Sequence, residues 1–309
     1  MKLHQTVEHY ISLKQSLGFR FATESQILKS FSKAMGKVSV GQVKPTSVRA
    51  YLDGSGPVTR NWERKWVALR GFYLFALARG LARQSPLPAW APKVARSFTP
   101  YIYSVAELRR LLQAIHPERA AKGLSASTLR TLLLLLYGAG LRISEALQLK
   151  ETDVDLKDRL LYVRTSKFFK SRLVPIGPKL AKVLGDYAGK RSEIRHPNRP
   201  FFQTDQGTPV SRSTVERIFR KLCAAADVKR TDGTRYQPRL HDLRHSMATH
   251  CLVGWYRQGR NAQSLLSQLS AYLGHIDIAG TQKYLTMTPE LREQASARFA
   301  RYALGGTRE

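Results

Sequence analysis

The chain has 309 residues and a formal net charge of +29, with 51 Lys and Arg against 22 Asp and Glu. At about 150 residues per domain, this length predicts roughly two domains. Hydrophobic residues make up 43% of the chain and charged residues 24%, which excludes a disordered polyelectrolyte and is enough for a globular core.

Three features bear on the compartment. Purely apolar runs such as residues 132–137 are far shorter than the ~18 residues that a membrane span needs. The first residues lack the apolar segment of a secretory signal. The two cysteines, Cys223 and Cys251, exclude a disulfide framework and favour a reducing compartment. We therefore expect a cytoplasmic protein with no membrane partner.

The positive charge is spread along the chain. Residues 1–100 hold 16 Lys and Arg against 4 Asp and Glu, and residues 101–309 hold 35 against 18. Two folded basic halves are typical of a protein that binds a polyanion with both domains. A merely soluble basic protein is the alternative interpretation of the same composition.

The first part of the chain has the periodicity of helices. Amphipathic patterns begin at residues 7–13, 23–31 and 48–52, and a longer one covers residues 62–81. Either Thr23 or Ser25 is a candidate N-cap. No strand signal is found here, so we predict a helical domain over residues 1–85.

Lysines recur four residues apart on these N-terminal helices, at Lys29, Lys33 and Lys37. Such a row repels itself unless an anion neutralises it, although a solvated face is the simpler alternative. We expect these lysines to contact the DNA backbone rather than the bases.

Four prolines within residues 86–100 predict an extended linker. A second domain over residues 101–309 follows, and its first helix is signalled by a capping box at residues 104–107. The fold class that we predict is mainly α with a small β-sheet. Further elements are expected in chain order: helices over 129–149 broken at 138–140, strands at 160–163 and 172–176, a helix over 179–187, a second capping box at 213–216, a helix over 240–253 and a tail helix over 289–303.

Candidate chemical groups stand out in this half of the chain. Arg142 follows a glycine bend, Lys167 lies in a basic turn, His241 and Arg244 share a helix face, and His275 precedes Tyr284 by nine residues. Two arginines can grip one phosphodiester and stabilise a pentavalent transition state. A tyrosine can attack phosphorus if cations or a base help to deprotonate it, since its free pKa is about 10. Histidine and lysine can move the protons, so neither metal nor cofactor is expected.

Taken in order, these motifs resemble the tyrosine recombinase (phage integrase) family over roughly residues 101–290. The segments that carry the resemblance are residues 140–147, Lys167, residues 172–176, residues 241–250, residues 273–275 and Tyr284. The stretch 273–291 is most similar to integrases carried by transposons or insertion sequences. The resemblance implies a mobile-element enzyme for DNA integration, recombination or transposition, close to the nucleoid.

The resemblance also implies an architecture and a reaction. A helical core-binding domain and a mixed α/β catalytic domain would form a C-shaped clamp around duplex DNA. A homotetramer on two specific DNA sites would exchange strands through a Holliday junction and 3′-phosphotyrosyl links. No cofactor is needed, because the phosphotyrosine conserves the bond energy. The tail helix over 289–303 would dock on a neighbouring protomer.

Residue by residue, the resemblance implies that Arg142 and Arg244 form the phosphate clamp. Lys167 would protonate the 5′ leaving oxygen. Glu145 would support the active-site arginine and histidine. Lys170 competes for the lysine role, because phenylalanines follow Lys167 where the family often has a glycine-rich turn.

The same resemblance makes His241 and His275 the active-site histidines and Tyr284 the nucleophile. The span between these histidines contains an expected insertion at residues 254–260. Lys170 and Arg172 are expected to join the N-terminal lysines in binding DNA.

His245 lies four residues after His241, the spacing of two zinc ligands on a helix. A zinc hydrolase needs Glu after the first His, and this chain has Asp242. We expect no metal site and interpret His245 as a supporting, buried structural histidine. Two alternative functions are a type IB topoisomerase-like enzyme and a non-catalytic architectural DNA-binding protein.

Overall fold

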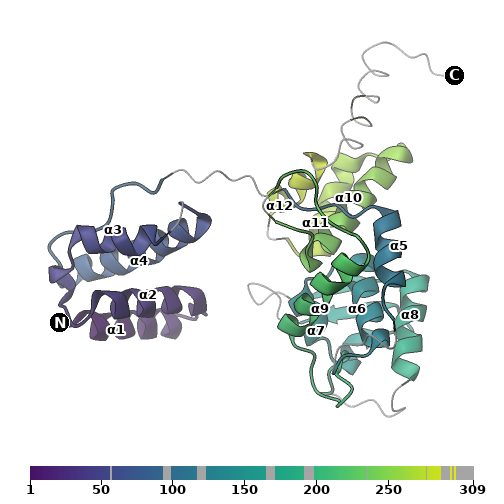
Figure 1. Cartoon of the computed structure of the whole chain (residues 1–309), viewed down its shortest axis with the longest axis horizontal. Helices are drawn as coiled ribbons and strands as arrows, with labels where there is room; N and C mark the ends of the chain where they lie inside the picture. The colour runs from purple at the N-terminus through teal and green to yellow at the C-terminus, as the bar shows by residue number, and fades with distance from the viewer. Residues whose placement is uncertain are drawn as a thin grey trace. The chain divides into compact units, whose positions relative to one another are not determined.

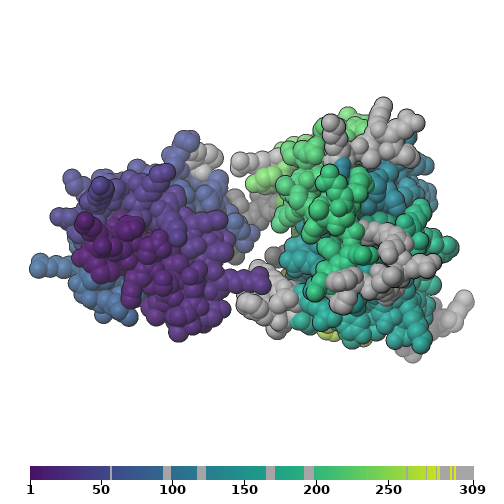
Figure 2. Space-filling view, turned by 90° about the horizontal axis from the view of Figure 1, so that it is seen from below, coloured from purple at the N-terminus to yellow at the C-terminus, as the bar shows by residue number. Residues whose placement is uncertain are grey.

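The computed structural model describes residues 1–55, 58–92, 99–116, 123–164, 171–190, 198–234, 236–275 and 277–286, together with residues 293 and 296. The chain divides into two compact units, Met1–Ser97 and Phe98–Glu309, coloured purple to blue and blue to yellow in Figure 1. In Figure 2 the atoms of each unit form one contiguous body. Lys167, Lys170 and all but residues 293 and 296 of the expected tail helix lie outside the described residues. Among the described helices, none has the length and apolar character needed to cross a membrane.

Unit 1 is built from helices, as the periodicity predicts. They are α1 (Leu3–Ser16), α2 (Ala22–Met35), α3 (Pro45–Asp53) and α4 (Arg60–Ala78), with a short 3-10 turn, η1 (Val40–Gln42). Helix α4 packs against the other three α-helices. Its buried face carries Trp62, Leu69 and Phe72, which join Phe31 of α2 in the core. Burial of these large side chains is the main stabilising term of the unit.

The ends of α2 differ from the prediction. Neither Thr23 nor Ser25 is the N-cap, because the helix begins at Ala22 after Phe21, whose φ of 44° is left-handed. The helix ends at Met35, so Lys37 lies beyond it and does not extend the row of lysines as a helical face.

The proline-rich segment is partly packed on unit 1. Leu87 and Ala91 contact the hydrophobic core of that unit. The indole nitrogen of Trp66 donates a hydrogen bond to the carbonyl of Pro88 at 3.0 Å. Residues up to 91 therefore add to unit 1 rather than forming only a spacer.

Unit 2 combines helices with a small sheet. The strands β1 (Val154–Asp155), β2 (Leu160–Val163) and β3 (Arg172–Pro175) are antiparallel in the order β1-β2-β3. The helices are α5 (Val105–Gln113), α6 (Ala126–Gly138), α7 (Ile143–Gln148), α8 (Pro178–Gly189), α9 (Arg212–Ala225), α10 (Leu240–Arg257), α11 (Ala262–Leu273) and α12 (Ala279–Gln282), with 3-10 turns η3 (Glu151–Asp153) and η5 (Lys283–Thr286).

Helix α6 organises the core of unit 2. It packs against α8 and α10 and lies beside α8 in Figure 1. Leu132 and Leu135 are fully buried, as expected for a helix that is apolar on most sides. The chain then bends at Gly140, which has a φ of 59°, and α7 begins. This bend sets the position of Arg142.

Helix boundaries in unit 2 test the capping predictions. The capping box of Ser104 and Glu107 is confirmed at the start of α5. The second one is wrong, because Ser211 caps α9. Glu216 instead pairs with Arg212 on the exposed surface. Residues 254–257 of the expected insertion continue α10.

Candidate active site

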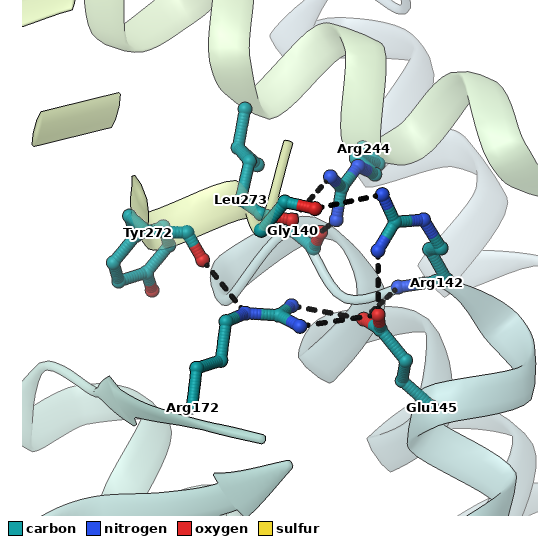
Figure 3. A network of polar contacts seen from close by, with 8 residues as sticks. Gly140, Arg142, Glu145, Arg172, Arg244, Tyr272 and Leu273 are labelled. Atoms are coloured by element: carbon teal, nitrogen blue, oxygen red, sulfur yellow. Dashed lines mark hydrogen bonds and ion pairs between the residues drawn. The ribbon is translucent and has the colours of Figure 1, made fainter. Parts of the chain in front are cut away.

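Three arginines from different elements converge on one turn. They donate to the successive carbonyls of residues 272–274, the turn that leaves α11 just before His275 (Figure 3). The guanidinium of Arg172 reaches the first carbonyl at 3.1 Å, that of Arg244 the second at 2.5 Å and that of Arg142 the third at 3.1 Å. Because each bond is local to one turn, the three cations are held close together.

A buried carboxylate separates two of these cations. Glu145 is 5% exposed and accepts from Arg142 Nη1 at 2.6 Å and from the Arg142 backbone N–H at 3.0 Å. Both terminal nitrogens of Arg172 also donate to it, at 3.1 and 2.9 Å. Burial raises the pKa of Glu145, but the hydrogen bonds and charges of Arg172 and Arg142 outweigh it and hold the pKa at about 2. The carboxylate is therefore ionised and fixes both arginines.

Arg244 is 1% exposed within α10. Its Nη1 donates to the carbonyl of Gly140 at 2.6 Å. Gly140 has a φ of 59°, which favours glycine at this bend, and a Cβ there would displace the end of the Met247 side chain. Burial and the charge of Arg142 lower the pKa of Arg244 to about 10, and the guanidinium stays charged at neutral pH.

Tyr284 lies in η5 and is 1% exposed. It packs in an apolar cluster formed with side chains of α10 and α11. Its ring stacks on His275 with centroids 6.2 Å apart, and its hydroxyl lies 3.1 Å from Nδ1 of His245. Burial raises the pKa of Tyr284, while the charge and hydrogen bond of Arg244 and the charge of Arg142 oppose that rise.

The nearby histidines are neutral at neutral pH. Nδ1 of His275 lies 2.7 Å from Oγ1 of Thr281, which orients its ring. His241 is exposed on the first turn of α10, and its ring centroid is 4.8 Å from that of His245. Partial desolvation and nearby arginines lower the pKa of both His241 and His275 to about 4. Burial and the neighbouring His241 lower that of His245 to about 3.

The structure brings together most of the residues expected at the site. Those described there are Arg142, Glu145, Arg172, His241, Arg244, His245, His275 and Tyr284.

Some placements differ from the expectation. Arg172, expected to contact DNA, is 13% exposed in its side chain and donates to Glu145 and to the turn. Glu145 contacts two arginines rather than an arginine and a histidine. His245 is not only a buried structural residue, because its Nδ1 lies within hydrogen-bonding distance of the Tyr284 hydroxyl.

Sequence reasoning did not find Thr281, which has no motif of its own and is recognisable only by its contact with His275. Within the described part of the chain, no group of three or more His, Cys, Asp or Glu side chains is arranged to hold a metal ion. The residues at this site are instead suited to binding a phosphate and delivering a phenol to it.

The chain is similar in sequence to known proteins over most of its length. The phage integrase family model matches residues 104–290. The integrase/recombinase y4rB of Sinorhizobium fredii is 32% identical over 304 residues, covering 96% of both chains. Tyrosine recombinase XerC of Chlorobaculum tepidum is 29% identical over 300 residues, covering 87% of this chain and 81% of that protein.

The fold is also shared with a solved structure. A lambda integrase tetramer bound to a Holliday junction superposes with a TM-score of 0.69 at 18% identity, covering 92% of this chain and 77% of that chain. The family model covers more than half of the chain and the y4rB relative nearly all of it. The chain therefore belongs to the phage integrase family, and it is a tyrosine recombinase.

Proposed function

We propose that this recombinase cuts and rejoins DNA at a specific site through a 3′-phosphotyrosyl link to Tyr284. The observation that carries the proposal is the gathering of a tyrosine hydroxyl, two neutral histidines and a fixed pair of arginines around residues 272–274. Attack by the phenol oxygen forms a bond to phosphorus and breaks the bond to the 5′ oxygen. The reverse attack by a 5′ hydroxyl rejoins the strand.

Arg142 and Arg244 would bind the two non-bridging oxygens of the scissile phosphate. Their charge would stabilise the additional negative charge of the pentavalent transition state. Glu145 and Arg172 would act through Arg142, because they hold its guanidinium beside that of Arg244. A preorganised pair of cations avoids the cost of ordering two long side chains at each turnover.

The neutral imidazoles of His241 and His275 would donate hydrogen bonds to the phosphate and help to move protons. Lys167 would protonate the departing 5′ oxygen, and Lys170 is the alternative for this role. None of these steps needs a metal ion or a nucleotide.

We further propose that unit 1 and unit 2 both bind duplex DNA. The lambda integrase of similar fold binds a Holliday junction as a tetramer. A homotetramer of this chain would likewise bring together two DNA sites and exchange strands in pairs. The enzyme would act in the cytoplasm on nucleoid DNA, and its substrate would be the ends of a mobile element.

Trapping the covalent intermediate tests this proposal. Supercoiled plasmid carrying the DNA that flanks the gene is incubated with protein in EDTA, and SDS then traps any protein–DNA adduct. We expect an adduct with the wild type and none with Tyr284→Phe. Tyr272→Phe is the matched control, because Tyr272 also lies near the turn but donates its hydroxyl to the carbonyl of Pro175. An adduct that survives Tyr284→Phe would overturn the assignment.

A further inference from the structure

The hydroxyl of Tyr284 lies near a cation and a ring nitrogen. The guanidinium of Arg244 lowers the pKa of the hydroxyl, and Nδ1 of His245 lies 3.1 Å from its oxygen. A guanidinium only donates, so the phenol proton cannot be directed to Arg244. In the tautomer that carries its proton on Nε2, His245 offers Nδ1 as an acceptor within reach of this proton.

We propose that His245 is a positioning residue for the nucleophile: its neutral imidazole accepts the phenol O–H and so turns the free lone pair of Tyr284 toward Arg244. The proposal rests on the nucleophilic role proposed for Tyr284. The hydrogen bond between His245 and Tyr284 does not depend on that role.

Because the Tyr284 ring is held in place, this hydrogen bond sets the direction of the O–H group. The ring is fixed by the apolar cluster and by stacking on His275, so the main freedom left to the hydroxyl is rotation of its O–H bond. A wrong rotamer would point the proton, rather than a lone pair, at the phosphate. Because attack requires aligned orbitals, a single acceptor that selects the rotamer raises the fraction of productive encounters.

The groups around His245 keep its imidazole ring neutral. They are His241 and Arg244 on its own helix, Arg239 at the start of that helix, His275 from the turn after α11, and the phenol of Tyr284. The two arginines are positively charged and the other groups are neutral, so protonation of His245 is disfavoured. Its pKa of about 3 keeps the ring neutral throughout the physiological range, so one of its two nitrogens is free to accept a hydrogen bond.

Helix α10 contains a second bond of the same kind, which provides an internal control. Nδ1 of His250 lies 2.9 Å from the hydroxyl of Tyr137, a residue of α6. Burial also lowers the pKa of His250. This pair has the same chemistry, but its tyrosine is not the proposed nucleophile.

The first test does not depend on activity. Full-length protein labelled with 15N-histidine is studied by NMR without DNA. We expect an unprotonated Nδ1 on His245 whose resonance moves in Tyr284→Phe, whereas the His250 resonance moves in Tyr137→Phe. A protonated Nδ1 on His245, or no response to Tyr284→Phe, overturns the proposal.

The second test measures the rate of adduct formation on the same plasmid at saturating protein. We expect His245→Phe to be slower on the order of 100-fold, since it keeps the ring and removes the acceptor. His245→Asn should retain most of the rate, because its side-chain oxygen can reach the position of Nδ1. His250→Phe should match the wild type. Equal effects of His245→Phe and His250→Phe would overturn the proposal.

The pH profile separates positioning from simple destabilisation. A phenolate needs no proton acceptor, so the deficit of His245→Phe should narrow as pH rises from 7 toward the pKa of Tyr284. A deficit that stays constant with pH marks a purely structural role and overturns the proposal. If the wild type forms no adduct on any DNA, the proposed nucleophile fails, and the NMR result alone still decides whether His245 orients the hydroxyl.

Discussion

Glu145 accepts hydrogen bonds from both terminal nitrogens of Arg172, at 3.1 and 2.9 Å, although 27 residues separate the two in the chain. The pair joins the first turn of α7 to the first residue of β3. Because Glu145 also binds Arg142, its buried carboxylate links the sheet to the arginine that we propose binds the scissile phosphate. The pair is therefore a structural support for the site as well as a stabilising interaction.

Replacing Glu145 with Gln should destabilise the fold and change its response to acid. Its pKa in the folded state is about 2, below the ordinary 4.5, so the charged form contributes stability above pH 4.5 and loses it as pH falls toward 2. We expect Glu145→Gln to lower the free energy of unfolding at pH 7 by about 3 kcal/mol, since it leaves buried arginine charge uncompensated. Urea unfolding between pH 7 and 2 measures both effects. Below pH 4.5, the free energy of unfolding of the variant should change less with pH than that of the wild type.

The control for this change is Glu216→Gln. Glu216 pairs with Arg212 at 2.7 Å, a distance like those at Glu145, but its side chain is 44% exposed. Exposed pairs contribute about 0–1 kcal/mol, so the variant should unfold almost as the wild type does. Losses of similar size in the two variants would contradict the role that we assign to burial.

Gly274→Ala should impair cleavage more than it impairs folding. Gly274 has a φ of 66°, and a Cβ there would lie 2.8 Å from the guanidinium of Arg172. That guanidinium is held by Glu145 and the carbonyl of Tyr272, so it cannot simply move aside. Displacing it should disturb the clamp and reduce adduct formation on the order of 100-fold, as misplacement of about 1 Å can do. Quenched time courses of the SDS-trapped adduct measure this loss.

Gly259→Ala separates the backbone effect from the contact with Arg172. Its φ is 67°, nearly the same as that of Gly274, but no heavy atom lies within 4 Å of the Cβ position. Both variants carry the strain of a left-handed alanine, about 1 kcal/mol. Only Gly274→Ala should lose cleavage, and equal losses would mean that strain alone is responsible.

Local signals in the sequence were sufficient to predict most of the described helices. The periodicity over 62–81 predicted a helix that the structure places at Arg60–Ala78, and the capping box at Ser104 marked the start of α5. Capping was less reliable at residues 213–216, because Ser211 can also accept from the helix amides and does so. Strand β1 has two residues, too few for any alternation to be recognised.

The composition of the site was predictable, but its internal contacts were not. The order of the motifs identified Arg142, Arg244 and Tyr284 as residues of one site. No local pattern could reveal that His245 contacts a hydroxyl 39 residues further along the chain. The same holds for Arg172, which was expected to bind DNA: its side chain is 13% exposed and pairs with Glu145 of another element.

The lysines of α2 allow a test of backbone binding by unit 1. Lys29 pairs with Glu8 at 3.3 Å, whereas Lys33 is exposed. We expect Lys33→Ala to weaken binding to all DNA sequences alike and to reduce the salt slope by about 1, because one phosphate contact is lost. Lys29→Ala should have the smaller effect, since Glu8 already neutralises part of its charge. Fluorescence anisotropy at several salt concentrations measures both, and a loss confined to one sequence would contradict a backbone contact.

Deleting residues 286–309 should separate DNA binding from assembly. The segment begins after Tyr284, and its sequence places Leu291, Ala295 and Phe299 on one face of the helix expected over 289–303. If that face docks on a neighbouring protomer, the truncated chain should bind a single site with wild-type affinity in a gel shift and form no paired-site complex. Leu291→Asp in the full chain is the matched variant, because it disrupts the apolar face without removing the segment. Wild-type recombination by the truncated chain would mean that the partner contacts lie elsewhere in the protein.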